Sequence, residues 1–187
     1  LQETFSTGQW PGDGKGPSPI KVEADVLEKV SDKTPLVSKL AEKANVDIVL
    51  ARPVNLSVRS SDYLAALVAN AVLGYDSFAC RLAPVRDRYG LTYGIYSRIV
   101  DPEFPYGPWS IELSVNPENV KRALEIVKKI VGEFDKGGIS PEELAKEKSH
   151  LAGAYLVGLR SPRALARKIC EYEQLGLPLK NLDNFPW

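Results

Sequence analysis

The chain has 187 residues, of which 44% are hydrophobic and 26% charged, proportions that are ordinary for a soluble globular protein. Its 24 basic and 24 acidic side chains cancel, so no excess of Lys and Arg can neutralise phosphates, and we expect no nucleic acid among its partners. No run of 18 apolar residues occurs, so we expect no membrane span, and a cytoplasmic or a periplasmic location would both fit.

The beginning of the chain is typical of an extended arm or a linker, because residues 1–19 are rich in Gly, Pro and Ser and have no hydrophobic period. Residues 20–187 are enough for a single domain. The pattern between Ile20 and Lys43 is mixed and fits a hairpin as well as a short helix. Because the chain has no Met, begins with Leu1 and lacks a signal-peptide pattern, we expect a fragment of a longer polypeptide or a processed product.

The first clear element is a strand at Val46–Val54, where a short apolar run is closed by Pro53. A helix is predicted at Ser61–Gly74, because apolar residues recur there at helical spacing. We expect Ser61 to cap its beginning and Gly74 to end it in a left-handed conformation. The residues expected on its buried face are Leu64, Leu67, Val68, Ala71 and Val72.

A second, shorter helix is predicted from about Phe78 to Arg88, ending near Gly90. Residues that are β-branched or aromatic then predict two strands, at Thr92–Val100 and Trp109–Val115. A Pro-rich hairpin loop joins these strands, so we expect them to be antiparallel. Along the second strand, the residues expected on one side are Trp109, Ile111, Leu113 and Val115.

Three helices are predicted to complete the chain. The first has Asn116 as its N-cap and ends at Gly137-Gly138, the second opens with a capping box from Ser140 to Glu143, and the third opens with Ser161-Pro162. The order of the elements predicts an α+β fold with helices on one face of a mostly antiparallel sheet. The expected core-facing residues are Val120, Ala123, Leu124, Val127, Ile130, Val131 and Phe134 in the first helix and Leu165, Ile169 and Tyr172 in the third.

The chain offers little for a catalytic site of its own. His150 is its one histidine, so neither zinc motif, H-E-x-x-H or H-x-x-E-H, can be written, and no G-x-S-x-G elbow or phosphate-binding loop occurs. Glu143, Glu147 and His150 share a helix stripe that could in principle hold a metal. We interpret this stripe as a solvated outer face, because apolar residues occupy the opposite side. Those apolar residues are Leu144, Leu151, Tyr155 and Leu159.

Two further groups of residues have plain structural interpretations. Cys80 and Cys170 are too few for a disulfide framework, so we expect buried, unpaired thiols, although a single bridge would be possible in an oxidising compartment. Phe104, Tyr106 and Trp109 could line a peptide groove or a domain interface. We favour a small apolar cluster under the hairpin for these three residues.

Arg86 and Tyr93 remain as candidates for binding. Neither is a plausible base at neutral pH, but both are strong hydrogen-bond donors that suit a peptide carbonyl, or the oxyanion formed when water attacks it. Gly90 permits the chain reversal that brings the two side chains to one groove. From spacing alone, an Arg that complements a helix dipole and a Tyr that packs would explain the same residues more simply.

The interval from Arg86 to Tyr93 reads R-x-x-x-G-L-x-Y, and it lies in a longer region, Asn45–Pro178, that resembles a known family. That family is the pitrilysin/insulinase-type zinc peptidases, and the resemblance is to their C-terminal, metal-free half. The supporting features, in chain order, are the apolar strand Asp47–Leu50, a helix that ends in Leu73-Gly74, the pair Arg81-Leu82 ahead of the arginine segment, and the run Gly138–Leu144, which is similar to the family's G-I-[ST]-x-E-E-L turn.

The resemblance implies a two-half zinc endopeptidase whose similar α+β halves enclose a chamber. One half binds zinc through H-x-x-E-H and a distant Glu, and the other contributes an Arg and a Tyr that hold the substrate backbone. On this basis Arg86 and Tyr93 bind and orient the peptide substrate. Zinc is then expected on the partner half, either in the same polypeptide or in a separate subunit of a homo- or heterodimer. This chain alone is expected to hold no metal and to be inactive.

Two alternatives stay open. The first is a proteolytically inactive structural or assembly subunit on the same fold, although such a subunit would not need both Arg86 and Tyr93. The second is an unrelated binding module that acts alone, which would have to bind its ligand as a monomer.

Overall fold

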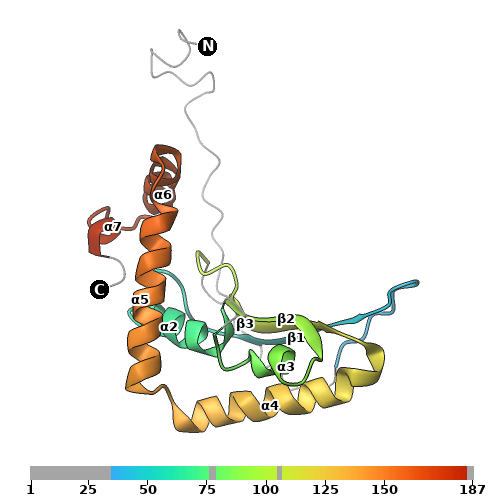
Figure 1. Cartoon of the computed structure of the whole chain (residues 1–187). Coiled ribbons are helices and arrows are strands. Elements are labelled where there is room, and N and C mark those ends of the chain that lie inside the picture. The colour runs from blue at the N-terminus through green and yellow to red at the C-terminus, as the bar shows by residue number, and fades with distance from the viewer. Residues whose placement is uncertain (1–34, 76–78, 105–106, 185–187) are drawn as a thin grey trace. The chain divides into compact units, whose positions relative to one another are not determined.

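Three strands form one antiparallel sheet in the computed structural model, which describes residues 35–75, 79–104 and 107–184 (Figure 1). The strands are β1 at Val46–Pro53, β2 at Thr92–Ile99 and β3 at Pro108–Val115, and their spatial order is β1-β3-β2. They confirm the predicted strands to within a residue at each end. The arm predicted for residues 1–19 and the boundary at residue 20 lie outside the described residues.

The alternation of side chains along the strands gives the sheet two different faces. Ile48 and Leu50 of β1 lie opposite Leu113 and Ile111 of β3, and Leu113 lies opposite Ile95 of β2. These residues belong to the hydrophobic core on one face of the sheet. The largest fully buried hydrophobic side chains are Ile95, Ile111 and Val115 from the strands and Leu82, Val85 and Val127 from the segments that cover them.

The helices supply the cover for this core face. Leu73 of α2, Val85 of α3 and Ala123 of α4 all pack into the core, and α5 packs against α2. This arrangement confirms the predicted α+β fold (Figure 1). A short final helix, α7, was not predicted. The bounds are α2 Tyr63–Gly74, α3 Pro84–Asp87, the 3₁₀ turn η1 Pro117–Asn119, α4 Val120–Gly137, α5 Pro141–Gly158, α6 Pro162–Leu175 and α7 Asn181–Asn184.

The predicted caps of the later helices are confirmed. The side chain of Asn116 accepts the Glu118 N–H at 3.1 Å, and the side chain of Ser161 accepts the Ala164 N–H at 3.1 Å. Ser140 and Glu143 form both halves of the capping box that begins α5. These side chains satisfy N–H groups that have no partner within the first turn of a helix.

The ends of α2 differ from the prediction. Its N-cap is Asp62, whose side chain makes no capping hydrogen bond, and Ser61 donates its hydroxyl to Asp62 instead. Gly74 is the last helical residue, and Tyr75 after it stays right-handed, so Gly74 is not a left-handed cap. The physical reason for glycine is space, because a Cβ on Gly74 would lie 2.7 Å from Leu82 Cδ1.

The helix predicted from Phe78 to Arg88 is largely wrong. Phe78 lies outside the described residues, and helical structure begins only at Pro84. The N–H groups of Arg81 and Leu82 donate to the carbonyls of Val72 and Leu73, each at 3.0 Å. The chain therefore pairs with the last turn of α2 before a new helix begins.

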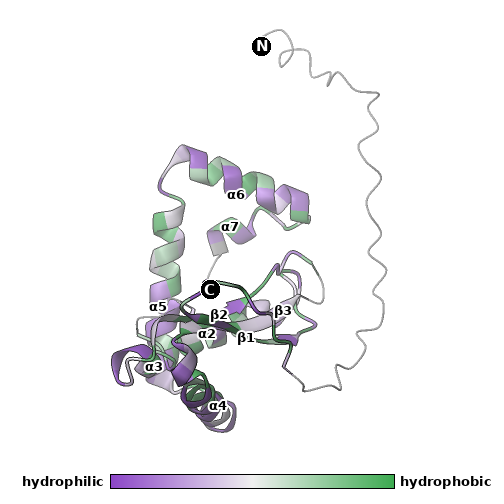
Figure 2. Cartoon of the chain, turned by 90° about the vertical axis from the view of Figure 1, so that its right-hand side faces the viewer, coloured by the Kyte–Doolittle hydropathy of each residue, from purple (hydrophilic) through white to green (hydrophobic). Residues whose placement is uncertain are grey.

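Some residues expected in the core are exposed. Leu64 is 41% exposed, and on α6 Leu165 and Ile169 are 41% and 37% exposed, whereas Tyr172 is buried. Figures 1 and 2 show that α5 leads away from the sheet and that α6 follows at its far end, with hydrophobic and hydrophilic residues alternating along it. The apolar side of α6 is thus not covered by the sheet within the described residues.

The contact at Gly74 makes a testable prediction about stability. Gly74→Ala should lower the free energy of unfolding by about 1 kcal/mol, since overpacking against the buried Leu82 outweighs the gain in helix propensity. Gly153→Ala in α5 is the matched control, because an added Cβ there meets nothing within 4 Å, and it should raise stability by about 0.5–1 kcal/mol. Urea unfolding of both variants measures this, and equal stabilisation by the two changes would contradict the packing argument.

Candidate functional site

Arg86 lies in the single turn of α3, directly after a core residue. Val85 is fully buried, whereas the Arg86 side chain is 22% exposed. Its Nε donates to Asp87 Oδ1 at 2.7 Å and its Nη2 to Asp87 Oδ2 at 3.3 Å. These hydrogen bonds raise the pKa of Arg86 and lower the pKa of Asp87, so both groups are charged at neutral pH.

A tight reversal joins α3 to β2, as the sequence predicted. Gly90 has a φ of 59°, which favours glycine over other residues. The Gly90 N–H donates to the Arg86 carbonyl at 3.0 Å, and the Leu91 N–H donates to the Val85 carbonyl at 3.1 Å. Arg86 and Tyr93 are therefore carried on the two sides of one hydrogen-bonded reversal.

Tyr93 lies on a β-bulge and is 95% exposed. The pairing of β2 with β3 shifts register between Thr92 and Ile95, and Tyr93 falls within this interval. The Thr92 hydroxyl spans the irregularity, because its Oγ1 lies 2.7 Å from the Gly94 carbonyl oxygen and 2.8 Å from the Ser114 carbonyl oxygen. Bulges re-aim side chains, so the bulge accounts for the full exposure of an aromatic residue in a strand.

The sequence analysis did not single out Thr92, which neighbours the candidate site. A threonine in a strand carries no local signal for this role, since its partner Ser114 belongs to the neighbouring strand. The sequence analysis also did not single out Tyr96 and Arg98, which follow on β2. The Arg98 guanidinium lies 5.1 Å from the centre of the Tyr96 ring, and its Nε lies 3.8 Å from Glu112 Oε2.

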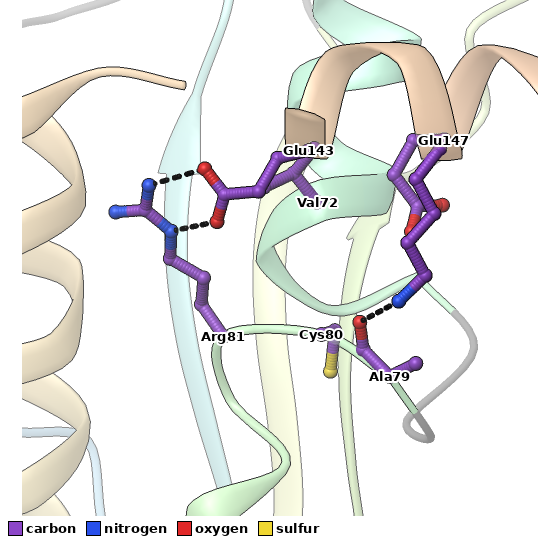
Figure 3. Close-up of a pocket in the computed structure, with 7 residues that line it drawn as sticks. Val72, Ala79, Cys80, Arg81, Glu143 and Glu147 are labelled. Atoms are coloured by element: carbon purple, nitrogen blue, oxygen red, sulfur yellow. Dashed lines mark hydrogen bonds and ion pairs between the residues drawn. The ribbon is translucent and has the colours of Figure 1, made fainter. Parts of the chain in front are cut away.

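A separate polar pocket of about 160 Å³ lies between α2, α5 and residues 79–81 (Figure 3). Arg81 donates two hydrogen bonds to Glu143, both at 2.7 Å, and its Nη2 also donates to the Gly138 carbonyl at 2.9 Å. Glu143 in addition accepts the Ser140 N–H at 2.9 Å. The Arg81 hydrogen bonds, with help from Ser140, lower the pKa of Glu143 to about 2. This ion pair fastens the start of α5 to the segment that precedes α3.

The stripe of Glu143, Glu147 and His150 is only partly the solvated outer face that was predicted, because the His150 side chain is 45% exposed but the two glutamates are covered. Glu143 binds Arg81, and Glu147 is 6% exposed, since this side of α5 packs against α2. His150 Nδ1 lies 3.1 Å from Glu147 Oε2. These three residues do not fit a metal site, and no group of three or more His, Cys, Asp or Glu among the described residues could hold an ion.

The aromatic residues of the hairpin and the two cysteines were the other groups considered in the sequence analysis. Trp109 is partly buried and donates its Nε1 hydrogen to Ser97 Oγ at 2.9 Å, whereas Phe104 is 61% exposed and Tyr106 lies outside the described residues. Cys80 is half-buried and Cys170 is exposed, and no disulfide joins them, so the expectation of buried thiols is wrong for Cys170.

A larger, mostly apolar groove of about 650 Å³ lies on the core face between α2 and α4. Its floor includes Leu50, Trp109 and Ile111 from the sheet. It shares no lining residue with the segment from Arg86 to Tyr93, so it is not part of that site. Across the described residues, none of the helices is long and apolar enough to cross a membrane.

The Arg81–Glu143 pair makes a prediction about pH. The folded pKa of Glu143, about 2, lies below its usual value of 4.5, so its stabilising effect is complete above pH 4.5 and is lost as the pH falls toward 2. Glu143→Gln should therefore lower the free energy of unfolding at pH 7 by about 1 kcal/mol, because the pair is partly solvated. Thermal unfolding of variant and parent should converge near pH 2, and Glu142→Gln, an exposed change in the same turn, should cost little at any pH.

The comparisons with known proteins agree with this fold and with the absence of catalytic zinc motifs. The sequence model of the family described as "Peptidase M16 inactive domain" matches residues 2–151. The crystal structure of a peptidase M16 inactive domain from Pseudomonas fluorescens is similar, with 29% identity and a TM-score of 0.68. The similarity covers 76% of this chain and 34% of that chain, so this chain spans about a third of its length.

Two further structures show the same fold. A protease from Helicobacter pylori has 18% identity and a TM-score of 0.62, covering 74% of this chain and 33% of that chain. The inactive peptidase domain of a proposed zinc protease from Bordetella parapertussis has 19% identity and a TM-score of 0.59, covering 72% and 74% of the two chains.

No curated protein matches the chain in sequence. The family match nevertheless extends over most of the sequence, and it confirms the resemblance to the metal-free half of zinc peptidases. The chain belongs to the peptidase M16 inactive domain family.

Proposed function

We propose that this chain is the non-metal half of a zinc-dependent endopeptidase and that Arg86 and Tyr93 hold the peptide substrate for hydrolysis on a partner half. The observation that carries the proposal is the 95% exposure of Tyr93 on a bulge beside the turn that carries Arg86. A tyrosine that served only packing would be covered, and here its hydroxyl is open to a ligand. The membership of the peptidase M16 inactive domain family supports the same role.

The chemistry follows from what these two side chains can donate. Arg86 keeps its charge, since its ordinary pKa is already high and Asp87 raises it further. The Tyr93 hydroxyl adds a neutral donor at the other side of the reversal. Two donors directed at one peptide carbonyl orient it, and they stabilise the negative charge that develops on its oxygen when water attacks. Zinc on the partner half would activate that water.

The partner is therefore a domain that carries an H-x-x-E-H motif, in the same polypeptide or in a separate subunit. Within residues 35–75, 79–104 and 107–184, no group of three or more His, Cys, Asp or Glu is placed to hold a metal ion. The alternative is a structural or assembly subunit on the same fold. In that case, substitution of Arg86 or Tyr93 should not affect peptide turnover.

Substitution of the two donors tests the proposal in the intact enzyme. Arg86→Ala and Tyr93→Phe should each lower kcat/KM for a peptide by about 10- to 1,000-fold, as expected for the loss of one oxyanion donor, while the zinc content stays unchanged. Arg163→Ala on α6 and Tyr75→Phe after α2 are controls on the same chain and should retain turnover. Unaltered turnover in both Arg86→Ala and Tyr93→Phe would favour the structural subunit.

The bulge offers a second, independent test. Thr92→Val removes the hydroxyl that lies within hydrogen-bonding distance of both the Gly94 and the Ser114 carbonyls and should lower kcat/KM about tenfold, because Tyr93 is then less well positioned. Thr92→Ser keeps the hydroxyl and should retain most of the activity. Steady-state kinetics on both variants, with circular dichroism to confirm folding, distinguish the hydroxyl from the methyl group. Equal activity of the two variants would show that the Thr92 hydrogen bonds do not position Tyr93.

A further inference from the structure

The face of the sheet that points away from the helices carries an unexplained group on β2. Ile95 and Ser97 are buried on the core face, so Tyr96 and Arg98 between and after them point to the open face. Their register partners on β3 are Glu112 and Ser110. This group lies on the same strand as Tyr93 and continues from it along the sheet.

The Tyr96 side chain points along the strand toward Gly94, and so toward the proposed site. A Cβ built on Gly94 would lie 2.9 Å from the Tyr96 hydroxyl oxygen and 3.0 Å from its Cε2, so the ring covers the backbone at Gly94. Glycine at this position makes room for the ring. The Tyr96 hydroxyl therefore lies beside the bulge that presents Tyr93, and the ring itself serves as a support for Arg98.

Arg98 is held in place but its donors are unused. Its side chain is 53% exposed, and the Tyr96 ring lies 5.1 Å away, within the range of a cation–π contact. Among the described residues, the carboxylate paired with it is Glu112, whose Oε2 is 3.8 Å from the Arg98 Nε. This distance is too long for a hydrogen bond, and Glu112 Oε1 accepts the Ser110 hydroxyl at 2.9 Å instead. Within the described part of the chain, the Arg98 guanidinium donates no hydrogen bond.

These features suit the binding of a carboxylate. A guanidinium presents parallel N–H groups that match both oxygens of a carboxylate, and stacking on an aromatic ring fixes its plane. Same-face residues of a strand repeat about every 7 Å, which is also the repeat of alternate side chains in an extended peptide. Arg98 follows Tyr93 by five residues on β2, which is roughly 16 Å at about 3.3 Å per residue. An extended peptide whose carbonyl is held at Arg86 and Tyr93 could therefore place a side chain several residues away at Arg98.

We propose that Arg98, supported by Tyr96, is a specificity-determining residue that selects peptides with an acidic side chain several residues from the bound carbonyl. This inference rests on the proposed peptide-binding function. It assigns to the open face of β2 the recognition of a side chain, whereas Arg86 and Tyr93 act on the peptide backbone that all substrates share.

Peptide binding to the intact parent protein tests the inference. The partner half would carry glutamine in place of the glutamate of its H-x-x-E-H motif, so that peptides are bound without being cleaved. The probes are two fluorescent peptide pools with randomised flanks and either Asp or Asn at the central position, and fluorescence anisotropy gives their Kd values. The unaltered chain should bind the Asp pool about fivefold more tightly, and this preference should shrink at high salt.

Variants then assign the preference to Arg98. Arg98→Gln should bring the Asp-to-Asn ratio close to one and leave the Kd of the Asn pool unchanged, and Arg98→Lys should give an intermediate ratio. Arg52→Gln is the matched control, because Arg52 lies on β1 opposite Trp109, on the other face of the sheet, and it should leave the ratio unchanged. Equal Kd values for the two pools in the unaltered chain, or a preference that persists in Arg98→Gln, would overturn the assignment.

The two proposals fail in different ways. If turnover falls in Arg86→Ala and Tyr93→Phe but Arg98→Gln keeps the preference for Asp, only the inference about Arg98 is wrong. If turnover is unaffected by Arg86→Ala and Tyr93→Phe while Arg98→Gln abolishes the Asp preference, the substrate-holding role is wrong and Arg98 remains a carboxylate receptor.

Discussion

The burial of Val85 is the constraint on which the candidate site depends. Val85 and Leu82 are both fully buried, so the short turn that carries them is packed against the core beneath β2 and α4. Arg86 follows Val85 directly, and a well-packed neighbour leaves its backbone little freedom. Leu91, buried in the same cluster, donates its N–H to the Val85 carbonyl at 3.1 Å, one residue before β2 begins. Core packing therefore fixes both sides of the reversal that presents Arg86 and Tyr93.

Features that act within one element could be predicted from the sequence, and features that depend on a second element could not. The alternation along β3 and the capping box at Ser140 involve residues a few positions apart, and both were predicted correctly. Gly74 is an example of a residue whose role could not be predicted from its own element. A glycine after an amphipathic helix has the same local signature whether it caps the helix or makes room for a neighbour, and the neighbour here, Leu82, comes from a later turn. The turn before α3 was mispredicted for the same reason, since its N–H groups bind carbonyls of α2.

For the candidate site, the sequence likewise predicted which residues to consider, but it did not predict the local backbone structure around them. Arg86 and Tyr93 stand out by chemistry and spacing, and Gly90 has the positive φ that its position in the reversal indicated. The bulge at Tyr93 depends on the register of β2 against β3, which the sequence of one strand does not specify. Glu147 shows the converse error, because a polar helix stripe can face solvent or a neighbouring helix, and the packing of α5 on α2 decides between them.

Three arginines of this chain differ in how far their donors are used, and the difference bears on the binding roles proposed for Arg86 and Arg98. Arg81 gives two hydrogen bonds at 2.7 Å to Glu143, whose oxygens also complete a helix cap, so an incoming ligand would have to break a network that holds α5. Arg86 is paired with Asp87, which is 54% exposed, so a substrate carbonyl would compete there with a solvated carboxylate. Arg98 is supported by a ring and hydrogen-bonded to no side chain of the described residues. The Arg81 donors in the pocket of Figure 3 are thus the most committed to the fold, and the proposed peptide recognition uses the two arginines whose engagement would disturb the fold less.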